Sequence, residues 1–227
     1  SDTQGYRTSR ARRCGLAPLR GFRQARDSIP VAARPIASGV KPWQRIVAME
    51  SESDTRGAFD DLHRSLAAVL EREPGSPLLV RASFETLLGA FITRAQQHRG
   101  EMALVIFELE GDKAVRESAG AADFERAIAD LGRELRRRLR ACDEIGRLGE
   151  AQIAAVLPGC DEPSLNLVAE RLRVALEGTE LSLGSRRVSP SLVMAAIPAP
   201  LGPASSAERA LEELDRALDR ARGAGSA

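Results

Sequence analysis

The change in apolar periodicity at Met102 constrains the fold of this chain more than any other feature. Met102–Glu110, which reads MALVIFELE, is a continuous apolar run ending in acidic residues, a pattern typical of a buried strand. The run is far too short to span a membrane. A stretch from about Asp123 to Ala141 follows, and its apolar residues recur at helical spacing. A strand followed by an amphipathic helix predicts an α/β domain with its own core.

The remaining elements extend this pattern in both directions. Two helices are expected before Met102, at 55–73 and 79–98. After the helix that ends near Ala141, the expected elements are a hairpin of Asp143–Arg147 with Gln152–Leu157, a helix at Pro163–Glu177, strands at Glu180–Leu183 and Arg187–Ile197, and a helix at Ser205–Arg222. The order from Met102 predicts an α/β (α+β) fold with a ferredoxin-like βαββαβ core. Its central sheet would be mostly antiparallel, with helices on one face, and an N-terminal helix would precede it.

The charge is distributed unevenly along the chain. Residues 1–48 carry a net charge of +8 and are rich in Arg, Pro, Gly and Ser, whereas the rest carries −7. We therefore expect three parts: a disordered basic extension at 1–48, an amphipathic helical segment at 49–75, and one domain at 76–227. The extension is read as an upstream addition or as a basic arm for an anionic partner. The acidic body argues against DNA binding.

The residues that usually build metal sites and disulfides are scarce. The chain has Cys14, Cys142 and Cys160 at scattered positions, and its only histidines are His63 and His98. These residues predict no disulfide framework, no metal site and no cofactor, and they fit a reducing, cytoplasmic location.

Three strings, in order, carry a resemblance to a known family. Arg140–Pro158 reads RACDEIGRLGEAQIAAVLP, Phe107–Lys113 reads FELEGDK, and Leu214–Ser226 reads LDRALDRARGAGS. They resemble the RxxD and GG(D/E)EF signature, the DxDxFK motif and the C-terminal helix of the GGDEF family. The resemblance covers about residues 76–226. It implies a nucleotide-cyclase-like fold and bacterial signal transduction, since active members join two GTP molecules into cyclic di-GMP.

Several positions depart from the family pattern. The signature reads Gly149, Glu150, Ala151 and Gln152, so its metal-binding acidic residue is replaced by Ala151 and its second glycine by Glu150. Glu108 stands where the family has its first metal-binding aspartate. The guanine-reading positions correspond to Arg116 and about Glu125, and the late phosphate-binding arginine to Ser226. The resemblance therefore leads us to expect a degenerate site with no catalytic residues, in a domain that is not an enzyme.

The second nucleotide site of the family is better matched. Many members bind cyclic di-GMP through an RxxD motif and an arginine on the following helix, and these positions correspond to Arg140, Asp143 and Arg171. An arginine can contact a phosphate or the guanine edge through two hydrogen bonds, and a carboxylate can accept from guanine. We expect Arg140 and Asp143 to lie exposed on one patch. The resemblance thus implies a cyclic di-GMP receptor that signals to an unknown protein partner.

Two alternatives remain open at this point. Arg140, Asp143 and Arg171 would have only structural roles if the RxxD match reflects the abundance of arginine near a helix end. The chain would then be a protein-interaction module that binds no nucleotide. Its helices at 55–98 would provide a surface for a partner or for a homodimer.

Overall fold

The computed structural model describes residues 23–24, 57–110, 116–117, 119–183, 186–199, 201–202 and 204–224. A helix at 57–66 lies between β1 and α2 in the chain. The labelled elements are β1 (Arg23–Gln24), α2 (Arg81–His98), β2 (Met102–Leu109), α4 (Ala121–Arg138), β3 (Glu144–Arg147), β4 (Gln152–Pro158), α5 (Glu162–Glu177), β5 (Leu181–Leu183), β6 (Arg186–Val188), β7 (Leu192–Pro198) and α6 (Ala207–Ala224).

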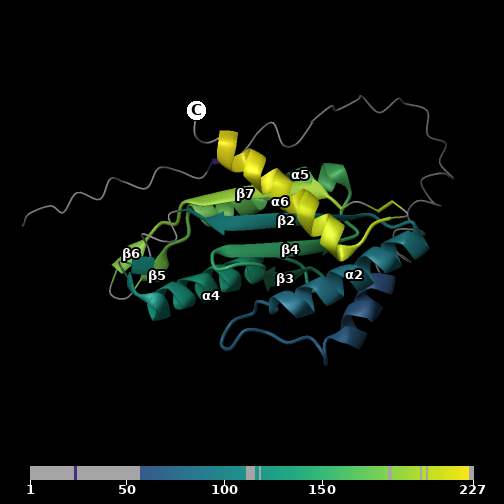
Figure 1. The fold of residues 1–227 in the computed structure, drawn as a ribbon, viewed down its shortest axis with the longest axis horizontal. Helices are drawn as coiled ribbons and strands as arrows, with labels where there is room; N and C mark the ends of the chain where they lie inside the picture. Colours follow the sequence, from purple (N-terminus) through teal and green to yellow (C-terminus); the bar gives the residue numbers. More distant parts are fainter. Residues whose placement is uncertain are drawn as a thin grey trace, which may run out of the picture.

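In this part of the chain, the strands form a five-stranded sheet in the order β1-β7-β2-β4-β3 and a two-stranded sheet of β5 and β6 (Figure 1). Strand β2 pairs antiparallel with both β4 and β7, and β3 pairs antiparallel with β4. The predicted α/β fold, with a mostly antiparallel central sheet flanked by helices, is therefore confirmed.

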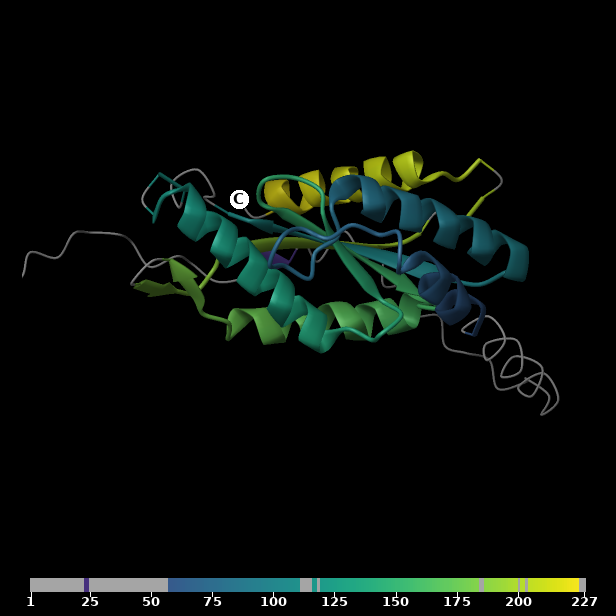
Figure 2. The ribbon, with the colours of Figure 1, turned by 90° about the horizontal axis from the view of Figure 1, so that it is seen from below.

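The apolar run in β2 is explained by its place in the centre of the sheet. Side chains alternate across a strand, so Leu104 and Ile106 join the core under α2 and α6, while Val105 and Phe107 join the core under α4 and α5. Figure 2 shows α2 and α6 on one side of the sheet and α4 and α5 on the other. A strand covered on both faces needs apolar residues at every position. The prediction of helices on a single face was wrong for the same reason: the sheet has two apolar faces, and both need a cover.

Local signals placed most elements correctly. Asp161 caps α5 by accepting a hydrogen bond from the Ser164 amide at 2.9 Å, and aspartate is one of the residues that favour this position at the start of a helix. The β3–β4 hairpin has the predicted partners, with Arg147 opposite Ile153.

Two element boundaries differ from the sequence-based expectations. The strand expected at Arg187–Ile197 is divided into two strands. β6 ends before Pro190 and β7 begins after it, because proline has no backbone N–H for sheet pairing. The helix expected at 55–73 is described only at 57–66. Residues 71–80 instead form a turn, in which the Glu73 amide donates a hydrogen bond to the Leu78 carbonyl at 2.9 Å.

Two residues of the basic extension at 1–48 belong to the described part of the structure. Arg23–Gln24 forms β1 and pairs in parallel with Val193 and Met194 of β7. The expectation that residues 1–48 are disordered otherwise lies outside the described residues. Among the helices that the structure describes, none has the length and apolar character that a membrane crossing requires.

Candidate functional site

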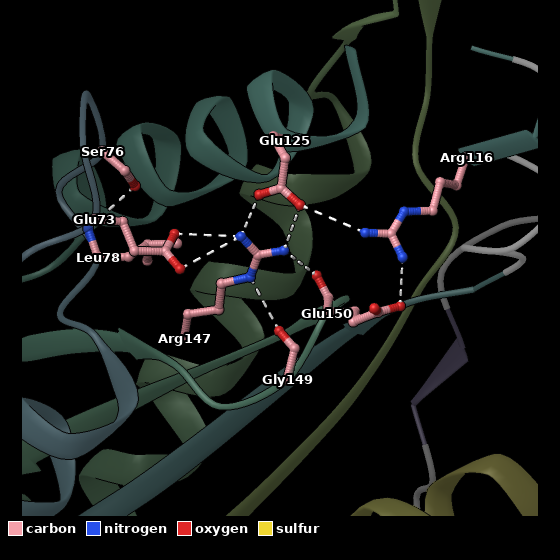
Figure 3. A network of polar contacts seen from close by, with 8 residues as sticks. All are labelled: Glu73, Ser76, Leu78, Arg116, Glu125, Arg147, Gly149 and Glu150. Carbon is pink, nitrogen blue, oxygen red and sulfur yellow. Dashed lines mark hydrogen bonds and ion pairs between the residues drawn. The ribbon is translucent and has the colours of Figure 1, made fainter. Parts of the chain in front are cut away.

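The turn between β3 and β4, residues 148–151, contains positions that correspond to the GG(D/E)EF signature, and we call it the signature turn. Arg147 holds this turn in place. Arg147 donates to the carbonyls of Gly149 at 3.0 Å and Glu150 at 2.7 Å. The same guanidinium binds both carboxylate oxygens of Glu125 on α4 and lies 3.4 Å from Glu73 (Figure 3). These contacts join the turn, α4 and the segment before α2, and the Arg147 side chain at their centre is only 13% exposed.

Arg116 extends this network on its exposed side. It binds the Glu150 carboxylate at 2.7 Å, lies 3.8 Å from Glu125, and stacks over the Phe124 ring at 5.3 Å from its centroid. Figure 3 shows Arg116 and Arg147 on two sides of Glu125. The hydrogen bonds from Arg147 lower the pKa of Glu125, and those from Arg116 lower the pKa of Glu150. Both acids are therefore held in their charged form.

The structure brings together three positions that the resemblance assigns to guanine recognition and phosphate approach. Arg116, Glu125 and Glu150 compensate one another's charge, so the negative charge of Glu150, which alone would repel a phosphate, is offset by its arginine partner. Ala151 is buried, and its methyl group belongs to the core beneath α4 and α5. The sequence pattern did not reveal the central role of Arg147, because Glu73 and Glu125 are far from it in the chain. The only available signal was that Arg147 itself matches the family pattern.

Glu108 forms a second polar cluster at the end of β2. Its carboxylate accepts from Gln152 Nε2 at 2.7 Å and from Arg222 Nε at 2.7 Å. Glu108 and Gln152 are direct cross-strand partners, so Gln152, which stands where the family signature has a glutamate, supplies a hydrogen-bond donor to Glu108 instead of a negative charge. Burial alone would raise the pKa of Glu108, but the hydrogen bonds from Arg222 and Gln152 outweigh it and lower the pKa.

The residues around Glu108 do not fit a divalent cation well. Mg²⁺ requires several oxygen ligands in near-octahedral geometry, and Glu108 already accepts from Gln152 and Arg222. Ala151 offers no side-chain ligand at the second position. Within the described residues, no group of three or more His, Cys, Asp or Glu side chains is placed to hold a metal ion. Gly111–Lys113 of the FELEGDK string and Ser226 lie outside the described residues.

We expect Arg222→Met to raise the pKa of Glu108. The variant removes a charged donor while burial and the weaker hydrogen bond from Gln152 remain. Because the parent pKa is depressed, ionised Glu108 adds stability above its unfolded-state pKa, and this contribution is lost as the pH falls through the folded-state pKa. Carboxyl NMR titration measures the change. Arg216→Met, which removes the exposed pair of Arg216 with Glu212 on the same helix, is the control. An unchanged Glu108 pKa in Arg222→Met would contradict the conclusion that Arg222 lowers the pKa of Glu108.

The RxxD turn, residues 140–143, links α4 to β3 and has a different character. Arg140 is exposed, and its guanidinium makes no hydrogen bond or ion pair with any residue that the structure describes. The Asp143 carboxylate accepts from the Arg140 amide at 2.8 Å, and the Asp143 amide donates back to the Arg140 carbonyl at 3.3 Å. Asp143 is only 4% exposed. The expectation that it is exposed was wrong, because its carboxylate closes the turn rather than projecting from it.

Arg171 on α5 joins this turn to the neighbouring helix. Its guanidinium donates to the carbonyl of Arg138, the last residue of α4, at 3.1 Å. Burial raises the pKa of Asp143, and the amide of Arg140 together with the charges of Arg140, Arg136 and Arg171 opposes this rise. Of the three predicted residues, Arg140 and Arg171 therefore lie close enough to Asp143 to influence its pKa. Arg140 and Asp143 lie between the end of α4 and the start of β3.

Comparison with curated proteins finds relatives in bacteria. The chain is 30% identical to the probable diguanylate cyclase DgcE of Escherichia coli over 109 residues, which are 48% of this chain and 10% of that protein. It is 25% identical to the diguanylate cyclase DgcP of Pseudomonas aeruginosa over 182 residues, which are 80% of this chain and 26% of that protein. The chain thus spans about a tenth and about a quarter of the length of these two relatives.

Solved structures share the fold. The diguanylate cyclase SiaD of Pseudomonas aeruginosa, in complex with its activator SiaC, matches with a TM-score of 0.64 and 20% identity, covering 81% of this chain and 71% of that one. The GGDEF domain of DgcB from Caulobacter crescentus, in complex with c-di-GMP, matches with a TM-score of 0.61 and 16% identity, covering 69% of this chain and 92% of that one.

These findings correct one expectation and confirm another. The expectation that the chain is not an enzyme is contradicted, because the relatives that it matches are named diguanylate cyclases, which are enzymes. The family resemblance is confirmed by the model "Diguanylate cyclase, GGDEF domain", which matches residues 76–227, about two thirds of the chain. The chain therefore belongs to the GGDEF family of diguanylate cyclase-like signalling domains.

Proposed function

We propose that this GGDEF domain binds cyclic di-GMP at the RxxD turn and transmits the occupancy of that site to a protein partner. The observation that carries the proposal is that the exposed Arg140 side chain makes no hydrogen bond or ion pair with the described residues. The neighbouring Arg137 and Arg138 both pair with Glu134, and Arg136 donates to the carbonyls of the turn. Arg140 has no such partner among the described residues, so its donors are available to an anionic ligand.

Arg140 and Arg171 suit the chemistry of this ligand. A guanidinium can donate two parallel hydrogen bonds to a phosphate or to the O6 and N7 atoms of guanine. Arg171 uses one of its donors on the Arg138 carbonyl and is otherwise exposed. In this proposal Asp143 is a positioning residue, since its buried carboxylate fixes the backbone from which Arg140 projects.

A second candidate function is supported by the surface of α5. Leu167 and Val174 are 75% and 55% exposed, and they flank Arg171 at a spacing that places them on the same side of the helix. Exposed apolar side chains on one helix face suit contact with another protein. In this reading the domain is an interaction module whose binding needs no nucleotide.

Calorimetric titration of the whole chain with cyclic di-GMP tests the proposal. We expect saturable binding at about 100 μM protein, a concentration at which a micromolar site is readily detected. GMP, which has one base and one phosphate, is the control ligand and should bind more weakly. No heat and no thermal shift with cyclic di-GMP would contradict the receptor function and leave the interaction module in its place.

A further inference from the structure

The outward face of α5 is apolar, whereas the exposed faces of the other labelled helices are polar. Among the described residues, three large apolar side chains are mostly exposed, and two of them, Leu167 and Val174, lie on this helix. The exposed positions of α2, α4 and α6 hold charged, polar or small residues instead. Figure 2 shows α5 on the outer side of the sheet, next to α4. An apolar helix face that points away from its own domain suits a partner that covers it.

The apolar residues form a line along α5. Leu167 and Val174 are seven residues apart, which is almost two helical turns, so one lies above the other. Pro163, which is also exposed, continues the line one turn earlier. Leu165 and Leu172 lie on the opposite side of the helix and are buried in the core. The line therefore points directly away from that core.

Two opposite charges flank this line at the same level. Glu170 and Arg171 both lie between Leu167 and Val174 in the chain. Consecutive residues are about 100° apart around a helix, so these two charged side chains fall on opposite sides of the line. Glu170 accepts from Arg173 Nε at 2.8 Å, and a carboxylate can accept further hydrogen bonds. The face thus has an apolar centre with a negative side and a positive side.

These charges determine which orientation of a second copy fits the face. In a parallel pair related by a twofold axis, the Glu170 side of each helix faces the Arg171 side of the other helix, so opposite charges meet twice. In an antiparallel pair centred between Leu167 and Val174, each charged residue would face the same residue of the other copy. Parallel pairing also brings Leu167 to Leu167 and Val174 to Val174, at the seven-residue spacing typical of parallel helix pairs. The face is therefore complementary to itself in the parallel orientation.

We propose that two copies of this chain associate through α5, with the two helices parallel and in register. The inference rests on the interaction-module function, since it names a second copy as the partner of the same helix face. The apolar line is narrow, and small interfaces are weak, so we expect a dissociation constant on the order of 100 μM. Arg171 is also a proposed contact of cyclic di-GMP, so self-association has to be measured without nucleotide.

Charge exchange at the centre of the face tests the orientation. Arg171→Glu and Glu170→Arg should each weaken self-association about tenfold, because two symmetric surface pairs turn from attraction into repulsion. The double variant exchanges the two charges and should restore the affinity of the parent. Added salt should reduce the effect of each single change, since it screens exposed charges. Sedimentation equilibrium of the whole chain without nucleotide measures these dissociation constants.

The apolar line is tested separately. Leu167→Gln should weaken self-association about tenfold or more, because apolar burial is lost from both copies at once. Val69→Gln is the matched control, since Val69 is 70% exposed but lies outside α5. It should associate like the parent. Both changed side chains are mostly exposed, so thermal unfolding of both variants should resemble that of the parent and show that the fold is intact.

Three outcomes would overturn the inference. A parent protein that stays monomeric at about 1 mM would exclude a dimer of the expected strength. Equal weakening by Leu167→Gln and Val69→Gln would exclude α5 as the contact. Unaltered association of both single charge variants would exclude the parallel orientation, because no such change alters the like charges that face each other in an antiparallel pair. None of these results bears on the receptor function, which the calorimetric titration with cyclic di-GMP decides.

Discussion

Arg140→Ala is expected to weaken binding of cyclic di-GMP about ten- to hundredfold. The variant removes charge-assisted hydrogen bonds, which contribute about 1.5–3 kcal/mol, and each 1.4 kcal/mol corresponds to about a tenfold change in affinity. Arg140→Lys should also weaken binding, because an ammonium group cannot reproduce the planar pair of donors. Calorimetry on the whole chain measures both changes. The fold should be unaffected, since the Arg140 side chain is exposed and makes no hydrogen bond with the described residues.

Arg137→Ala is the matched control for this experiment. Arg137 is exposed, lies in the last turn of α4 just before the RxxD turn, and pairs with Glu134. Its removal should change the affinity little, apart from a small general electrostatic effect. Equal losses in Arg137→Ala and Arg140→Ala would indicate a diffuse electrostatic attraction to the basic end of α4. That result would contradict a defined site at Arg140.

The other two residues of the site should behave differently from each other. Arg171→Ala should weaken binding while α5 stays folded, because alanine favours helices. Asp143→Asn changes a buried group that accepts from the Arg140 amide. We expect it to affect the stability and the position of the turn as well as the affinity. This expectation replaces the one drawn from sequence, in which an exposed Asp143 would affect guanine discrimination more than stability.

Gly146→Ala is expected to destabilise the domain by about 1–3 kcal/mol, the usual cost of overpacking a core. A methyl group at this position of β3 would lie 2.6 Å from Cβ and 2.6 Å from Cδ2 of Phe84 on α2. Phe84 is fully buried, so it cannot move aside without disturbing its neighbours. In a domain of this size the melting temperature should fall by about 2–4 °C for each kcal/mol. Thermal unfolding followed by circular dichroism measures the change.

Gly178→Ala is the control for steric crowding. Gly178 ends α5 with a φ of −90°, which any residue adopts, and a Cβ there would meet nothing within 4 Å. The melting temperature of Gly178→Ala should stay close to that of the parent protein. If Gly146→Ala is equally well tolerated, β3 and α2 are not packed as closely as the structure indicates.

Much of the candidate site could be located from the sequence because it lies on local patterns. The RxxD turn follows a helix with a clear apolar stripe, and the signature turn lies within a hairpin whose two strands are close in the chain. What could not be predicted is which charges pair, since Arg147 combines Glu73, Glu125 and the carbonyls of the signature turn from three separate segments.

The sequence by itself determined the elements and their fold class. The uninterrupted apolar run of β2 defined a buried strand, and the stripe in α4 and the cap at Asp161 defined helices through contacts within a few residues. Only the tertiary structure decided how these elements meet. It placed β7 beside β2, divided the helices between two faces, buried Asp143 within its own turn and supplied Glu144 with partners from the N-terminal segment. The physical reason is that backbone patterns act over a few residues, whereas burial and charge compensation depend on side chains that come together only in the folded chain.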